Sequence, residues 1–278
     1  MIGNKKIPAS SIQVVPFFKN EWHFQFPRLD DRVYDMFHQA LEEFDAGNLG
    51  KAERSIRLLL EGYPEFVDAY HHLAMILDKT RRHKQARQVW ESAVRIGLDA
   101  FPNTFKRNRH RLPWGILDNR PFLRVYHSWG LQLFEEEKVE QALAVFNEIL
   151  SFNPNDNQGI RALVIDCHFH LHQPEKVLAI CRRYAGDTME EVLYGRPLAL
   201  FQLDRELEAR MALRDAIQIL PNVAKELLKK THRPPRNLNF NYVTHGGADQ
   251  AYYYWEHNGQ HWTNTKGALD LLSSVFHE

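Results

Sequence analysis

The sequence contains little cysteine and no long apolar run. Only two cysteines, Cys167 and Cys181, occur among 278 residues, and they do not form a Cys-x-x-Cys motif. We therefore expect two buried free thiols rather than a disulfide framework or a zinc–thiolate site. No stretch of about 18 apolar residues could cross a bilayer, and the first residues lack the hydrophobic core of a secretory signal. We expect a cytoplasmic protein with no membrane partner.

Charge of one sign is not in excess, and the common catalytic motifs are absent. The chain carries 35 Lys and Arg against 35 Asp and Glu, so a general nucleic-acid-binding field is not expected. It contains no glycine-rich phosphate loop and no nucleophile elbow. These absences predict a protein that is not an enzyme, holds no cofactor, and does not have nucleic acid as its main partner.

What the sequence has instead is a helical repeat. Residues 122–155 read as two amphipathic helices joined by a tight turn. Gly130 in the first helix and Ala142 in the second are small, so the two backbones can approach closely, and Phe146 fills the space between them. Pro154 ends the second helix because it has no N–H to donate. This spacing is typical of the tetratricopeptide repeat (TPR), whose period is about 34 residues.

Aligning the chain on the small residue of the second helix gives five such units. One hairpin cannot bury its apolar face alone, so neighbouring hairpins must stack. The sequence therefore predicts an all-α fold, a right-handed superhelical solenoid of about five TPR-like helix-turn-helix repeats over residues 29–230. Residues 231–278 are predicted to form a helical cap at the C-terminal end. The aligned positions are Ala52, Ala86, Ala142, Val177 and Ala209.

Two segments depart from the repeat. Residues 1–28 are rich in aromatic side chains and have no helical period, which predicts an extended arm that covers the open face of the first hairpin; a partner-binding or dimerising arm is the alternative. Residues 99–121 form an insertion between the second and third units. This insertion either wedges its aromatic residues into the solenoid or acts as a basic loop that grips an anion. The basic loop would consist of Lys106, Arg107, Arg109 and Arg111.

The first helix of each repeat is expected to line a concave groove. Arginine forks bind carboxylates in bidentate geometry, and aromatic rings give stiff contact area. We therefore predict a protein or peptide partner that carries acidic groups. In the alternative, Arg124 and Arg161 bridge adjacent repeats through Asp156 or Asp166. The predicted ligand-binding residues are His71, Arg124, His127, Arg161 and Tyr194.

Two pairs of histidines have a spacing that a metal ion could use. His168 and His172 stand four residues apart on one helix face, and His257 and His261 repeat this spacing. Zinc needs at least a third protein ligand, and none has convincing spacing in the sequence. No metal site is predicted.

Three phrases resemble a known family more closely than a generic repeat does. They are PWGILDNRPFLR (113–124), NPNDNQGIR (153–161), and a tail in which GGADQAYYYW is followed by TKGALDLL. Together they resemble the suppressor of tumorigenicity seven family and its microbial relatives, over about residues 113–275. The resemblance implies a helical-repeat architecture and no catalytic residues.

These observations predict a non-enzymatic scaffold or adaptor that binds a peptide or protein segment in its concave groove. A helical-repeat protein that binds nucleic acid through the basic insertion 106–111 is the alternative. A homo-oligomer is compatible with either.

Overall fold

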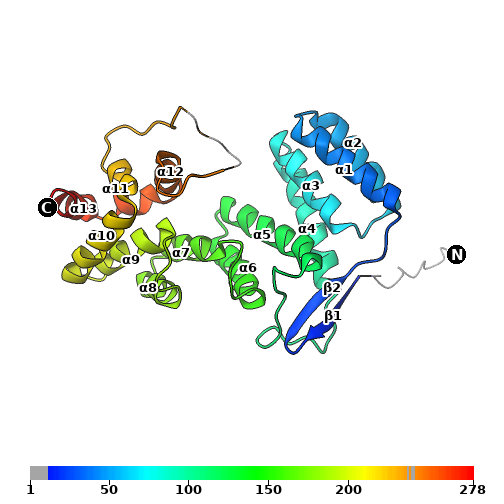
Figure 1. The fold of residues 1–278 in the computed structure, drawn as a ribbon, viewed down its shortest axis with the longest axis horizontal. Coiled ribbons are helices and arrows are strands. Elements are labelled where there is room, and N and C mark those ends of the chain that lie inside the picture. Colours follow the sequence, from blue (N-terminus) through cyan, green and yellow to red (C-terminus); the bar gives the residue numbers. More distant parts are fainter. Residues whose placement is uncertain (1–11, 237, 239–241) are drawn as a thin grey trace. The chain divides into compact units, whose positions relative to one another are not determined.

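The computed structural model describes residues 12–236, 238 and 242–278. The first eleven residues of the predicted arm lie outside this range. The chain divides into two compact units, Met1–Ile160 and Arg161–Glu278. Figure 1 shows that nearly all regular structure is helical. The predicted all-α solenoid of TPR-like hairpins is thus confirmed, with one small β-hairpin added.

The first unit contains three helical hairpins. The first two follow each other directly, and a 3-10 helix, η1 (Leu117–Asn119), precedes the third. Their helices are α1 (Asp31–Asp45) with α2 (Leu49–Gly62), α3 (Val67–Lys79) with α4 (His83–Asp99), and α5 (Arg120–Glu135) with α6 (Val139–Phe152).

Small residues let the two helices of each hairpin approach closely. In each of these hairpins the small residue of the first helix lies twelve positions before that of the second, and all six are buried. At Gly130 an added Cβ would lie only 2.4 Å from the ring of Phe146. The register read from the sequence is therefore correct. The pairs are Ala40 with Ala52, Ala74 with Ala86, and Gly130 with Ala142.

The described part of the N-terminal arm is an antiparallel β-hairpin, formed by β1 (Gln13–Phe18) and β2 (Glu21–Gln25). It packs on the insertion, not on the first helical hairpin as predicted. The Val14 N–H donates to the carbonyl of Ala100 at 3.0 Å, and the Trp22 N–H donates to that of Arg111 at 2.8 Å. These bonds satisfy backbone groups that the insertion, which has little regular structure, would leave unpaired.

Aromatic side chains fill the space between the β-hairpin, the insertion and α5. Phe24 is fully buried, and its ring centroid lies 5.7 Å from Phe101 and 4.9 Å from Phe122. Phe101 and Phe105 in turn reach Phe152 at 5.7 Å and 5.9 Å. The insertion thus wedges aromatic rings into the unit, as the first of its two interpretations predicts.

The second unit contains the fourth and fifth helical hairpins and the C-terminal helices. Both C-terminal helices predicted as a cap are present, α12 (Ala248–Asn264) and α13 (Ala268–Phe276). The short α11 (Pro221–Leu227) precedes them. The two hairpins are α7 (Ile160–His170) with α8 (Pro174–Arg183) and α9 (Glu190–Gln202) with α10 (Glu206–Ile219).

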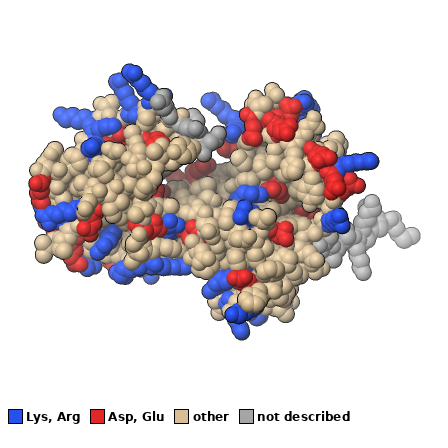
Figure 2. Space-filling view, in the orientation of Figure 1, with Lys and Arg blue, Asp and Glu red and all other residues tan. Residues whose placement is uncertain are grey.

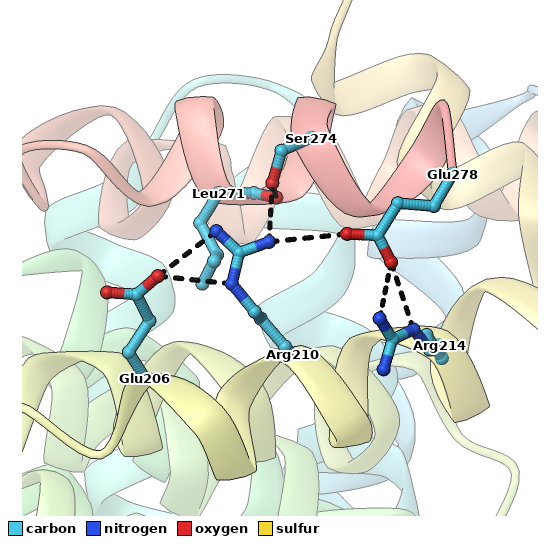
Figure 3. A network of polar contacts seen from close by, with 6 residues as sticks. All are labelled: Glu206, Arg210, Arg214, Leu271, Ser274 and Glu278. Carbon is cyan, nitrogen blue, oxygen red and sulfur yellow. Dashed lines mark hydrogen bonds and ion pairs between the residues drawn. The ribbon is translucent and has the colours of Figure 1, made fainter.

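A salt-bridge network joins α10 to α13 (Figure 3). Arg210 contacts Glu206 on its own helix and reaches Ser274 and Glu278 across the gap, where its Nη1 lies 2.9 Å from the Ser274 hydroxyl. Arg214 also pairs with Glu278. These side chains are largely exposed, and exposed ion pairs contribute only about 0–1 kcal/mol each. The network joins the two helices but contributes little to the stability of the unit.

Candidate functional site

Arg124, predicted to bind an acidic ligand, already holds a carboxylate of the protein. It lies on α5, and its Nη2 donates to both oxygens of Asp68 on α3, at 2.7 Å and 2.9 Å. The contact joins the second helical hairpin to the third. Arg124 therefore bridges adjacent repeats, as the alternative interpretation predicts, but its partner is Asp68 rather than Asp156 or Asp166.

The two histidines of the predicted groove are poorly placed to carry charge. His71 is only 9% exposed, and burial lowers its pKa to about 4, with His72, Arg124 and His127 adding to the effect. Burial likewise lowers the pKa of His127 to about 4. Both imidazoles are neutral at neutral pH. With Arg124 paired to Asp68, these residues offer no net positive charge to an acidic ligand.

Arg161 and Tyr194, the two predicted residues of the second unit, are also engaged. Arg161 forms an ion pair with Asp187 at 2.5 Å and lies 5.3 Å from the ring centre of Tyr184. Tyr194 is fully buried, and its hydroxyl donates to the carbonyl of Leu220 at 2.7 Å. The structure thus places Tyr194 in the core and does not present it to a ligand.

The basic insertion is exposed, but its positive charge is partly compensated. Arg107 pairs with Glu148 of α6 at 2.6 Å, and the ammonium of Lys106 donates to the Asn103 carbonyl at 3.0 Å. The backbone of Arg111 is bonded to the β-hairpin, and Arg109 is exposed. Figure 2 shows Lys and Arg interspersed with Asp and Glu on the visible face of both units.

A surface cavity of about 1070 Å³ lies in the first unit, where no site was predicted. It is bounded by residues of β2 and of the segment that follows it, by residues 62–68 at the facing ends of α2 and α3, and by η1. Tyr34, Tyr63 and Leu117 contribute apolar surface to it. Asp68, which holds Arg124, also lines it. These residues come from separate segments, so no single sequence signal marks the cavity.

In one of the two histidine pairs considered for a metal, the side chains lie in different environments. His168 is buried and its Nδ1 lies 2.9 Å from the side-chain oxygen of Gln173, while His172 is exposed. A different set converges within the second unit. His261 belongs to the second pair, and His170 lies between the two members of the first. Both lie near the carboxylate of Asp166, and the three ligand atoms lie within 4.8 Å of one another.

The remaining sequence expectations concern thiols and membranes. Cys167 and Cys181 are both buried and unbonded to each other, and burial raises the pKa of each thiol to about 12. They therefore remain protonated, with little nucleophilic character. Over the residues that the structure describes, no helix combines the length and apolar character needed to cross a bilayer.

The fold is similar to those of solved TPR proteins. A repeat protein from Parabacteroides merdae gives a TM-score of 0.54 at 13% identity, over 90% of this chain and 100% of its own. Part of a repeat protein from Cytophaga hutchinsonii gives 0.52 at 10% identity, over 86% and 77% of the two chains. YrrB, described as a TPR protein with an unusual peptide-binding site, gives 0.51 at 16% identity, over 67% and 85%. At such identities the likeness shows the fold alone, and it confirms the TPR-type repeats.

No curated protein sequence matches the chain. A family model does match, over residues 22–276, which include most of β2 and every helix of both units. The narrower resemblance to the suppressor of tumorigenicity seven family gains no support, because this match assigns the same residues 113–275 to another family. That family is described as transcriptional repressor TCF25. The chain belongs to the TCF25 family.

Proposed function

We propose that the chain is a protein-interaction scaffold whose first unit receives an extended segment of a partner protein. The observation that carries the proposal is the cavity lined by Tyr34, Tyr63 and Leu117, hereafter the apolar cavity. These side chains are 41%, 37% and 67% exposed in a unit that buries most of its other large apolar residues. Exposed apolar surface gathered in a hollow is typical of an interaction site.

The size and lining of the apolar cavity suit peptide side chains. Pockets for small ligands measure roughly 300–1,000 Å³, so a cavity of about 1070 Å³ has room for more than one side chain. Aromatic rings such as Tyr34 and Tyr63 lose little conformational entropy on binding and often dominate binding energy.

Polar groups at the edge of the cavity would orient the bound segment. Arg28 and Asp68 both line it, and Asp68 links it to Arg124. An acidic group of the ligand would have to compete with Asp68 for Arg124. We therefore expect the apolar lining to contribute more affinity than Arg124, although Arg124 remains a proposed contact. The family is described as a transcriptional repressor. In this proposal, such repression would act through contacts with other proteins.

The experiment compares two double variants that remove similar exposed apolar surface. Tyr34→Ser with Leu117→Ser changes the apolar cavity. Leu207→Ser with Met211→Ser changes α10 instead. Leu207 is 74% exposed and Met211 is 58% exposed, and both lie outside the cavity. Proteins that co-purify with each tagged chain after nuclease treatment are identified by mass spectrometry. A partner kept by the wild type and the α10 variant but lost by the cavity variant supports the proposal; equal recovery by all three contradicts it.

The same samples test the nucleic-acid alternative. Arg107 is already paired with Glu148, so we expect little nucleic acid to co-purify before nuclease treatment. A nucleic acid whose affinity falls steeply with salt, and falls again on substitution of Lys106 and Arg109, would favour that alternative, since phosphate contacts release counterions.

A further inference from the structure

We propose that Asp166, His170 and His261 form a binding site for a divalent transition-metal cation, for which Zn²⁺ is the best match. Two ligands come from α7 and one from α12, both in the second unit. A carboxylate oxygen and two imidazole nitrogens are ligands that zinc accepts, and two histidines with one carboxylate leave a further position open. This inference does not depend on the proposed partner-binding function.

The distances suit a cation after a small adjustment. His170 Nε2 lies 3.5 Å and His261 Nε2 lies 2.6 Å from the same oxygen of Asp166. Zinc–ligand bonds of about 2.0–2.2 Å at tetrahedral angles separate neighbouring ligand atoms by roughly 3.3 Å. The Asp166–His170 distance already fits. The Asp166–His261 distance is that of a hydrogen bond, and it must open by roughly 0.7 Å when the cation replaces the shared proton.

The fold holds these side chains in place before any ion arrives. Asp166 and His170 stand four residues apart, so they lie on one face of α7. The rings of His170 and His261 lie 4.9 Å apart at 84°, and Phe169 stacks on His261 at 5.0 Å. Asp166 and His261 are each only 8% exposed. Such preorganisation lowers the cost of assembling a site.

Gln260 could supply a fourth ligand, and the site has an entry path. The side-chain amide nitrogen of Gln260 on α12 lies 3.2 Å from His170 Nε2. Turning this amide over would present its oxygen to the cation instead, and the two orientations of an amide are nearly indistinguishable by shape. His170 has a side chain 31% exposed, so the site opens to solvent on that side. A bound cation would then clip α12 to α7, which lie 95 residues apart at His261 and Asp166.

The test uses the untagged full-length chain, since a polyhistidine tag would bind the same ions. Zn²⁺ binding is followed by equilibrium dialysis, and coordination by the visible absorption of bound Co²⁺. We expect one tight site in the wild type. His170→Gln and Asp166→Asn should each weaken binding by at least about tenfold, since each removes a direct ligand and loss of mere supporting contacts already costs that much.

His172→Gln is the matched control, because His172 lies two residues beyond His170 and is exposed. It should bind Zn²⁺ as the wild type does. Equal binding by His170→Gln and the wild type would overturn the proposal, as would a wild type that binds no cation. In either case Asp166 and His261 would form only a structural hydrogen bond. If Asp166→Asn fails to fold, the binding of Zn²⁺ by His170→Gln still decides, since the His170 side chain is partly exposed and its contact with Asp166 is long.

Discussion

The two units place an aspartate and a histidine near each other on the first helix of a repeat, with opposite results. On α3, Asp68 is taken by Arg124, and the nearby His71 is left buried with its pKa lowered to about 4. On α7, Asp166 is taken by His261, and His170 stands beside them. The local sequence is similar in kind. The difference lies in the side chain that another helix places against the aspartate. An arginine pairs with the Asp68 carboxylate, whereas a second histidine beside Asp166 gives three groups that can ligate a metal.

The same contrast extends to how closely the helices pack. In the first unit the close-contact position of the first helix is Ala40, Ala74 or Gly130. Twelve residues before Val177 and Ala209, the second unit has Ile165 and Pro197 instead. Both are buried, and α9 continues through Pro197. The second unit therefore fills with larger side chains a position that the first unit keeps nearly empty.

The largest expected effect tests the difference in helix packing between the two units, by substitution of one glycine in each. An added Cβ at Gly130 would lie 2.4 Å from the Phe146 ring, whereas at Gly195 it would lie 3.3 Å from Ile165. Gly130→Ala should destabilise the first unit by about 1–3 kcal/mol through overpacking. Gly195→Ala should change stability by less than about 1 kcal/mol, because the helix preference of alanine offsets the tight contact with Ile165.

Denaturant unfolding combined with hydrogen exchange of each unit's helices measures both changes. A matching loss of protection for the two variants would mean that the close approach at Gly130 is not specific to the first unit. The wild type and Gly195→Ala serve as the references for the first unit, since neither alters the Phe146 contact.

The next effect concerns pH, and two sets of titratable side chains, one in each unit, should act in opposite directions. His71 and His127 have folded pKa values of about 4, below the ordinary 6.5, so the unfolded chain binds more protons and the first unit loses stability as pH falls from 6.5 towards 4. Burial and the neighbouring Glu190 raise the pKa of Glu191 to about 8. The folded state then binds more protons, so Glu191 costs the second unit stability as pH rises from 4.5 to 8.

Hydrogen exchange at several pH values separates the two contributions. His71→Asn with His127→Asn should flatten the acid loss of protection in α3 and α5. Glu191→Gln should flatten the alkaline loss in α9 and leave the first unit unchanged. If the first unit kept the wild-type acid profile in the double variant, other groups would carry its acid sensitivity.

The repeat architecture could be predicted because its signal is local. The spacing of small and aromatic residues recurs with the helical period, and it located every hairpin. Four of the predicted ligand-binding residues share one environment. His71, His127, Arg161 and Tyr194 occupy equivalent positions of their repeats. None of them is exposed, because this position faces neighbouring elements rather than solvent.

Long-range pairing explains what the sequence could not provide. The β-hairpin depends on bonds from Val14 and Trp22 to an insertion some 90 residues away in sequence. The meeting of Asp166 with His261 spans 95 residues. Only the spacing of Asp166 and His170, four apart on one helix, was visible beforehand. The apolar cavity likewise assembles from segments that no periodicity connects.

The smallest expected effect lies in the turns, where the two units share one backbone conformation but differ in residue type. In every helical hairpin the residue two positions before the second helix has a positive φ, which glycine adopts without strain. The five residues and their φ values are Gly47 (79°), Arg81 (61°), Glu137 (59°), His172 (53°) and Asp204 (58°). Only the first hairpin uses the residue type that the turn favours.

Glycine at these turns should therefore stabilise, and more in the first unit than in the second. The left-handed conformation costs an ordinary residue about 1–2 kcal/mol, and Glu137→Gly removes this cost. Glycine loses more conformational entropy on folding, so the net gain in the free energy of unfolding is up to about 1 kcal/mol. Asp204→Gly should gain less, because aspartate tolerates this region better. Gly47→Ala should lose stability, and no side chain would obstruct it, since nothing lies within 4 Å of an added Cβ there. Thermal unfolding of the three variants measures the order; a gain at Asp204 larger than that at Glu137 would show that the turn's surroundings, rather than its φ, set the cost.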